Sequence, residues 1–208
     1  MYDNYVDRHC LSLQSEDMNI MKKKQMVGLL LAATMCLSGC GNAAIKTDTL
    51  SLSGNGTATY TIISDFTKDY YNLEELTTMA QEEVLAYGSG VQITEAVVEE
   101  GMLNFQYTFD SLSHYAAFMG TSCYQATVGQ ALKAGYKFDT QLISAKDGSS
   151  ILMKDEAIQG YQLFVWNESV AVRCDGNVLY YSSNLSTSGK RDVVPKEEAG
   201  GPYYVIYK

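Results

Sequence analysis

Residues 102–109 alternate between apolar and polar side chains, and no other segment limits the possible folds of this chain so strongly. The apolar positions are Leu103, Phe105, Tyr107 and Phe109. Successive side chains of a strand point to opposite faces of a sheet, so this pattern predicts a strand with one buried and one solvated face. Residues 91–99 precede it as the first arm of a predicted hairpin, which turns at Glu100-Gly101.

Helical signals stand on both sides of this hairpin. The spacing of apolar residues predicts a helix over residues 73–87, with Asn72 as its N-cap and Gly88 as its C-terminal glycine. Ser111 can cap a second, shorter helix. A third helix is predicted over residues 124–134. These helices are enough to cover one face of a sheet.

The remaining elements are predicted to be strands. Residues 57–64 are rich in β-forming side chains, and the last third contains further strand-like runs at 161–166, 169–174, 178–182 and 203–207. Asn167-Glu168 and Asp175-Gly176 are interpreted as hairpin turns, and residues 183–201 as an exposed stretch. The order of elements predicts an α+β fold, in which one antiparallel sheet has two or three helices packed on one face.

Residues 21–40 carry the features of a bacterial lipoprotein signal. Three lysines precede an apolar run at 26–37, and Leu37, Ser38 and Gly39 then lead to Cys40. The run is shorter than the ~20 residues that a spanning helix needs. The segment resembles type II signal peptides, whose lipobox cysteine receives a diacylglycerol before the chain is cut in front of it. This resemblance implies that Cys40 is the lipidated N-terminus, which holds the protein on the extracytoplasmic face of the cell membrane.

The signal divides the chain into predicted parts. Residues 1–20 are too acidic for the basic start of a signal peptide, so translation is expected to begin at Met18 or Met21 instead. Residues 21–39 are the signal peptide. Residues 40–56 are the lipidated cysteine and a tether, and residues 57–208 are a single domain.

The net charge restricts the partners of this domain. The chain has a formal charge of -9. Arg8 and the three lysines of residues 1–39 cancel the four acidic residues there, so residues 40–208 keep the whole charge. An acidic surface argues against nucleic acid, and it is not attracted to anionic lipid. The predicted contact with the membrane is therefore the lipid on Cys40.

Two cysteines follow Cys40, and their state is left open. Export permits a disulfide between Cys123 and Cys174, which would add about 4 kcal/mol on the chain-entropy model. The alternative is two buried thiols, because Cys174 shares a strand face with Val170 and Val172.

Residues that could support catalysis are sparse. His114 is the only histidine after Cys40, and its helix position predicts a solvated ring. One histidine and two distant cysteines do not give zinc-ligand spacing. Gly120-Thr121-Ser122 begins like a nucleophile elbow, but Tyr124 occupies the position of the second glycine. The sequence predicts no catalytic residue, no metal site and no cofactor.

The domain also resembles a set of small uncharacterised lipoproteins of Gram-positive, clostridia-like bacteria. The resemblance rests on Asp65-Phe66, Tyr70-Tyr71, Glu74-Glu75-Leu76, Phe118, Gly120-Thr121, Leu179 to Ser182, Asn184 and Tyr204 to Lys208. It implies a location at the envelope and no particular activity.

Two functions are compatible with these features. The first is a non-catalytic module that binds an envelope protein or takes part in envelope assembly, which predicts an exposed apolar or Tyr-rich patch. The alternative is a lipoprotein that binds a glycan or a small molecule. It predicts a pocket lined by Tyr70, Tyr71 and Trp166.

Overall fold

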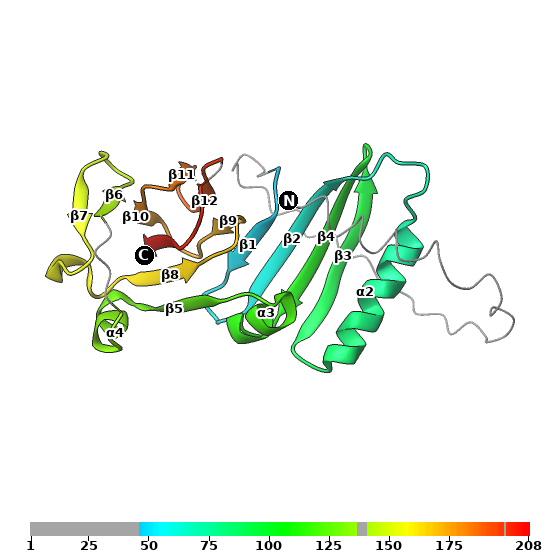
Figure 1. The fold of residues 1–208 in the computed structure, drawn as a ribbon, viewed down its shortest axis with the longest axis horizontal. Coiled ribbons are helices and arrows are strands. Elements are labelled where there is room, and N and C mark those ends of the chain that lie inside the picture. The colour runs from blue at the N-terminus through cyan, green and yellow to red at the C-terminus, as the bar shows by residue number, and fades with distance from the viewer. Residues whose placement is uncertain (1–45, 137–140, 198) are drawn as a thin grey trace, which may run out of the picture. The chain divides into compact units, whose positions relative to one another are not determined.

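The computed structural model describes residues 46–136, 141–197 and 199–208. The strands are β1 (Thr49–Leu52), β2 (Ala58–Asp65), β3 (Val91–Glu99), β4 (Met102–Phe109), β5 (Cys123–Thr127), β6 (Gln141–Ser144), β7 (Ser150–Leu152), β8 (Gln162–Trp166), β9 (Ala171–Arg173), β10 (Val178–Ser182), β11 (Leu185–Ser188), β12 (Asp192–Pro195) and β13 (Tyr203–Tyr207). The helices are α2 (Leu73–Tyr87), α3 (Leu112–Met119), α4 (Val128–Lys133) and the 3-10 helix η2 (Glu156–Ile158). They all belong to one compact unit, Ala44–Lys208 (Figure 1).

The strands form two sheets and not the single sheet that the sequence predicts. Sheet A has seven strands in the order β11-β12-β9-β1-β2-β4-β3, and sheet B has six in the order β5-β8-β13-β10-β6-β7. Only the β1–β9 pair is parallel among these ladders. The α+β class is confirmed. The predicted layering is wrong because most strands of the last third pair with partners far away in the sequence.

The predicted alternation builds the centre of sheet A. In β4 the side chains of Leu103, Phe105, Tyr107 and Phe109 are at most 2% exposed, and the residues between them are half-buried. The β3–β4 hairpin is confirmed, and it turns at Glu100-Gly101, where both residues have a positive φ. β2 pairs with β4 along its whole length. The local sequence therefore determines which face of the unit formed by β2, β4 and β3 is apolar.

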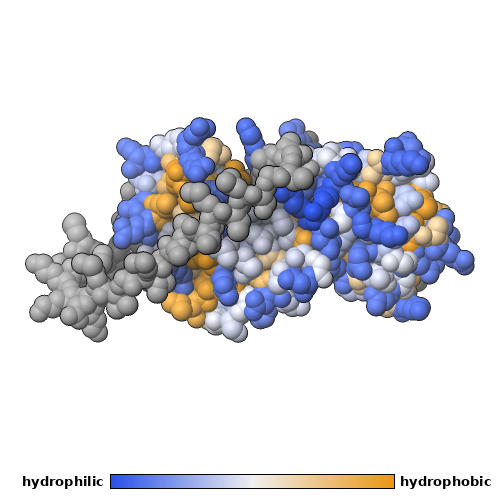
Figure 2. Space-filling view, turned by 180° about the vertical axis from the view of Figure 1, so that it is seen from behind, coloured by the Kyte–Doolittle hydropathy of each residue, from blue (hydrophilic) through white to orange (hydrophobic). Residues whose placement is uncertain are grey.

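The opposite face of sheet A is polar. Gln106 donates from its side-chain amide to Glu95, and the hydroxyls of Thr94 and Thr108 lie 3.2 Å apart. Seen from behind, the molecule presents blue, pale and orange side chains together (Figure 2). The hydrogen-bonded pairs match the predicted division of the hairpin into an apolar and a polar side.

The first two predicted helices are confirmed. The Asn72 side chain accepts hydrogen bonds from the backbone amides of Glu74 and Glu75, and Gly88 ends α2 with a φ of 109°. Leu76 and Ala80 are buried on its inner side, and α2 packs on β3. Ser111 caps α3 by accepting from the amide of His114 at 3.2 Å, so both caps lie where the sequence places them.

The third helix is shorter than predicted, because residues 123–127 form strand β5. β5 pairs with β8 in regular antiparallel register. The helix α4 begins after Thr127, whose hydroxyl accepts from the Gln130 amide in a reciprocal capping box. A capping threonine in extended geometry ends the strand and starts the helix at one residue.

The two predicted hairpin turns of the last third are also wrong. Both β8–β9 and β9–β10 connect strands that lie in different sheets. The Asp175-Gly176 turn therefore carries the chain between sheets. A Cβ on Gly176 would lie 2.4 Å from the Lys208 carbonyl carbon, which shows how closely the chain end approaches this crossing.

Two stretches predicted to lack structure contain strands. Residues 49–52, inside the predicted tether, form β1 between β2 and β9, and Leu50 there is fully buried. Residues 183–201 contain β11 and β12, which extend sheet A from β9. The tether prediction overlooked the Thr-Leu-Ser-Leu alternation because it is only four residues long.

Candidate functional site

Three aromatic side chains gather in the loop between β2 and α2. Phe66 and Tyr71 stack at 5.0 Å between ring centroids, and Tyr70 meets Tyr71 edge-on at 4.9 Å. Tyr70 is 55% exposed, while Phe66 and Tyr71 are half-buried. We refer to Phe66, Tyr70 and Tyr71 as the aromatic cluster. It brings together two of the three aromatic residues that the sequence predicted as ligand contacts.

Local hydrogen bonds hold this loop in place. The Asp65 carboxylate accepts from the backbone amide of Thr67 at 2.9 Å and from its hydroxyl at 2.6 Å. These bonds stabilise the charged form and lower the pKa of Asp65. The amide of Phe66 donates to the Gly101 carbonyl at 2.7 Å, which fastens the loop to the β3–β4 turn. The rings therefore stand on a preorganised support.

An exposed methionine extends this region. Met102 pairs with Asp65 in the β2–β4 ladder and is 44% exposed. Tyr70 and Met102 are two of the six large apolar side chains that stand out as exposed in the described part of the chain. Aromatic rings and methionine are enriched at protein interfaces.

Trp166 does not join the aromatic cluster, which corrects the predicted pocket. It is 2% exposed in sheet B and lies 5.3 Å from the rings of both Phe164 and Tyr203. Its indole nitrogen donates to the Val170 carbonyl at 3.3 Å. Trp166 is the last residue of β8 and is buried like Phe164 two residues before it, so its side chain packs in the core and is not available to a ligand. We refer to Phe164, Trp166 and Tyr203 as the core trio.

A carboxylate that the sequence did not single out lies in the connection between β8 and β9. Glu168 accepts a hydrogen bond of 2.5 Å from the Tyr115 hydroxyl and another from Thr121. Burial raises the pKa of Glu168 despite these bonds, and burial together with the Glu168 charge raises that of Tyr115. The sequence around Glu168 does not predict this hydrogen bond, because its partner Tyr115 lies 53 residues earlier.

A surface hollow of about 590 Å³ lies between α3 and β5. Its lining includes Leu112, Ser113, Ala116 and Ala117 from α3, and Cys123, Tyr124 and Gln125 from β5. Thr121 lines it as well, so the hollow begins beside the hydrogen-bond partner of Glu168.

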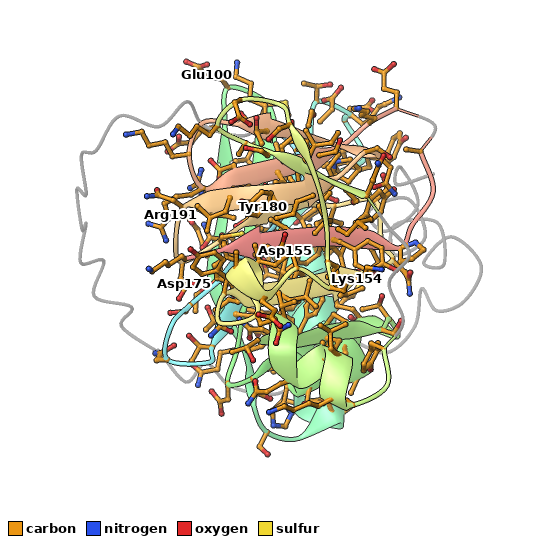
Figure 3. All side chains as sticks on the ribbon, turned by 90° about the vertical axis from the view of Figure 1, so that its left-hand side faces the viewer. Glu100, Lys154, Asp155, Asp175, Tyr180 and Arg191 are labelled. Atoms are coloured by element: carbon orange, nitrogen blue, oxygen red, sulfur yellow. The ribbon has the colours of Figure 1, made fainter. Side chains whose placement is uncertain are left out.

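The two cysteines are free, which corrects the disulfide alternative. Cys123 is half-buried and donates to the Leu112 carbonyl, and Cys174 is fully buried. Burial, then the Glu168 charge, raises the pKa of Cys123 to about 11. Burial also raises that of Cys174, which stands beside Asp175 and Arg191, labelled on the same side of Figure 3. Both residues are held as neutral thiols.

His114 is not the solvated ring that the sequence predicts. Its ring lies against Gly90, where an added Cβ would come within 2.6 Å of it. Its Nδ1 lies 3.1 Å from the Tyr87 hydroxyl. The histidine therefore joins α3 to the end of α2.

The described residues form neither a metal site nor a membrane-spanning helix. Across residues 46–136, 141–197 and 199–208, no three metal-ligating side chains come close enough together to hold an ion. Within the same residues, no helix combines the length and apolar character needed to cross a bilayer. The predicted lipobox Leu37, Ser38 and Gly39, with Cys40, lies outside the described residues.

Comparisons with known proteins leave the family open. No family model, no curated protein and no solved structure matches the chain.

Proposed function

We propose that the protein is a lipid-anchored, extracytoplasmic module that binds another envelope protein and catalyses no reaction itself. The observation that carries this proposal is the aromatic cluster. A half-exposed Tyr70 stands beside a stacked Phe66–Tyr71 pair on a loop that hydrogen bonds hold in place. The signal at residues 21–40 supports the location.

The chemistry of the aromatic cluster favours a protein partner. Tyrosine offers a large contact area and a hydroxyl with little rotamer freedom to lose, so it is enriched among residues that dominate binding energy. Preorganisation of the loop by Asp65 and Gly101 lowers the entropic penalty of association. Exposed aromatic side chains and methionine are both enriched at protein interfaces.

The alternative, a glycan or small-molecule site, has less support. A site of that kind is concave and is lined by several aromatic side chains. Burial of Trp166 removes one of the three side chains on which that hypothesis was built. The remaining pair, Tyr70 and Tyr71, meets edge-on and does not line the hollow between α3 and β5.

The proposed anchor is consistent with the charge of the domain. A formal charge of -9 gives no attraction to anionic lipid, so attachment depends on the acyl chains of Cys40. A single chain binds membranes only marginally, while two chains anchor a protein stably. We expect Cys40→Ser to move the protein from the membrane fraction to the soluble fraction. Retention of this variant in the membrane would contradict the lipid anchor.

Binding is tested by chemical cross-linking in the native cells, followed by capture with an antibody to the domain. Wild type is compared with Tyr70→Ala and with Leu85→Ala, which removes a side chain that is 77% exposed on α2. We expect one protein partner to be recovered with wild type and Leu85→Ala and lost with Tyr70→Ala. Recovery that is equal for all three chains would refute a role for the aromatic cluster. Recovery of glycan in place of protein would support the alternative.

A further inference from the structure

Strand β5 forms an outer edge of sheet B. It pairs with β8 alone among the described strands. Figure 1 draws it along the border of the sheet, between α3 and α4. A strand in this position leaves half of its backbone groups without a ladder partner.

The register identifies the residues whose backbone groups point outward. Val128, next along the chain, donates its amide to the Tyr161 carbonyl, so it takes part in the β5–β8 ladder. The direction of the backbone amide and carbonyl alternates from one residue to the next along an antiparallel strand. The backbone groups of Ala126 and Tyr124 therefore also point toward β8. The amides and carbonyls of Gln125 and Cys123 consequently point away from the sheet.

The hollow beside α3 runs along this free edge. Residues 123, 124 and 125 all line it, although their side chains alternate between the two faces of the sheet. Its opposite wall is α3, where Ala116 and Ala117 present small side chains. We refer to this hollow between β5 and α3 as the groove.

β5 lacks the protection that β3 and β7 have, while β11, the other border of sheet A, is four residues long and is also uncharged. β3, at the border of sheet A, contains an irregularity between Ile93 and Glu95 and carries acidic side chains. β7, at the other border of sheet B, is only three residues long. β5 is regular over five residues and has neither a charge nor a proline. Bulges, charges and short length are the usual means of preventing edge pairing, so this edge is open to a further strand.

We propose that this groove binds an extended segment of a partner protein, which adds to sheet B as a strand next to β5. The segment pairs with the outward backbone groups of Gln125, and its small, uncharged side chains face Ala116 and Ala117. A lysine or arginine stands at the end near Thr121, which lines the groove and is hydrogen-bonded to Glu168. The five residues of β5 match a segment of about five residues, or ~17 Å.

The charge and shape of the site favour this occupant over other partners. The chain carries a net charge of -9, which attracts a basic segment. Strand addition gains affinity from backbone hydrogen bonds, and the side-chain pockets add selectivity. This inference goes beyond the proposed function, because it does not depend on the aromatic cluster.

The test uses the full chain in detergent and the synthetic peptide Lys-Thr-Ala-Val-Ala-Thr as the probe. Hydrogen exchange measured by mass spectrometry reports on residues 123–127, and fluorescence titration of labelled peptide reports affinity. We expect the peptide to slow exchange in this segment. An N-methylated peptide lacks the amide donors and is expected to bind at least tenfold more weakly. A peptide with Glu in place of Lys is expected to bind more weakly than the Lys peptide.

Two variants make the test specific. Ala117→Trp fills the groove from α3 and should weaken binding at least tenfold, while Ala86→Trp, at an exposed position of α2, should not. Tyr70→Ala should leave peptide binding unchanged. The proposal for the groove and the proposal for the aromatic cluster can therefore be refuted independently. Equal peptide binding by the Ala117→Trp and Ala86→Trp variants, or no protection of residues 123–127 at millimolar peptide, would overturn the proposal. Protection that depends on protein concentration without peptide would also overturn it, since it would indicate a second copy of the chain.

Discussion

The aromatic cluster and the core trio contain the same kinds of side chain but use them in opposite ways. Phe66, Tyr70 and Tyr71 stand on a loop, and the exposed fraction of Tyr70 is 55%. Trp166 is 2% exposed within a sheet, and its ring lies between two other aromatic rings. The difference shows that aromatic content alone does not separate binding residues from core residues. The location of each ring on a loop or on an inward strand face decides its role.

The largest effect that separates the two groups concerns stability. Trp166→Ala removes a buried ring and one hydrogen bond, and we expect it to lower the free energy of unfolding by about 3–5 kcal/mol. Tyr70→Ala should change it by less than about 0.5 kcal/mol, because the side chain is exposed. Urea denaturation followed by circular dichroism measures both changes. Similar losses in the two variants would remove the contrast.

The next effect concerns recovery of the partner protein, for which the aromatic cluster should matter more than the core. Tyr71→Ala removes the ring that contacts both Phe66 and Tyr70, so we expect recovery of the cross-linked partner to fall at least about tenfold. Tyr136→Ala is the control, since Tyr136 is 42% exposed and stacks on Tyr124 in another part of the chain. A loss of recovery in the control variant as well would show that exposed tyrosines act without regard to position.

A smaller effect is expected from pH, and it concerns Glu168 in the connection between β8 and β9. Because burial raises the pKa of Glu168, the folded state keeps this proton at pH values where the unfolded chain has lost it. Stability then falls as pH rises from 4.5 through the raised value, and it is regained on acidification. Wild type should therefore gain stability relative to Glu168→Gln between neutral pH and pH 4.5. We expect about 1 kcal/mol or less, since solvent reaches this carboxylate.

The Glu168 comparison is made by urea titration of both chains at each pH. The glutamine can still accept from the Tyr115 hydroxyl, so the variant keeps the geometry and loses only the titration. A difference that does not change with pH would show that Glu168 titrates alike in the folded and unfolded chains.

The smallest expected effect on the fold concerns the thiols. Burial raises the pKa of Cys123 to about 11, so it should react slowly with iodoacetamide at pH 8, and Cys174 should not react until the chain unfolds. Mass spectrometry of chain unfolded without reductant should show both residues alkylated. A disulfide between them would instead protect both from the reagent.

Local patterns explain which parts of the fold are predictable. The β3–β4 hairpin and helix α2 depend on contacts within one short stretch, and residues such as Asn72, Gly88 and Phe105 signal them directly. Sheet B depends on distant pairs, such as β5 with β8 and β8 with β13. A turn signal such as Asp175-Gly176 reports a change of direction but not which strands it connects.

The candidate site divides along the same line. Tyr70 and Tyr71 are predictable because adjacent aromatic residues in a loop before a capped helix have no strand face to fill. The groove is not predictable, because it lies between α3 and β5, and β5 consists of residues that the local sequence predicts as helix. Those residues form a strand because they pair with β8. The Tyr115–Glu168 bond likewise joins elements that local sequence does not relate.

The most direct test of the account places a photo-cross-linking amino acid at position 70 of the full chain in its native cells. The same amino acid at position 85, on the exposed side of α2, serves as the reference. The account predicts that illumination joins position 70 to one recurrent envelope protein and that position 85 gives no such product. Products that are the same at both positions, or none at position 70 while the protein is correctly anchored, would contradict it.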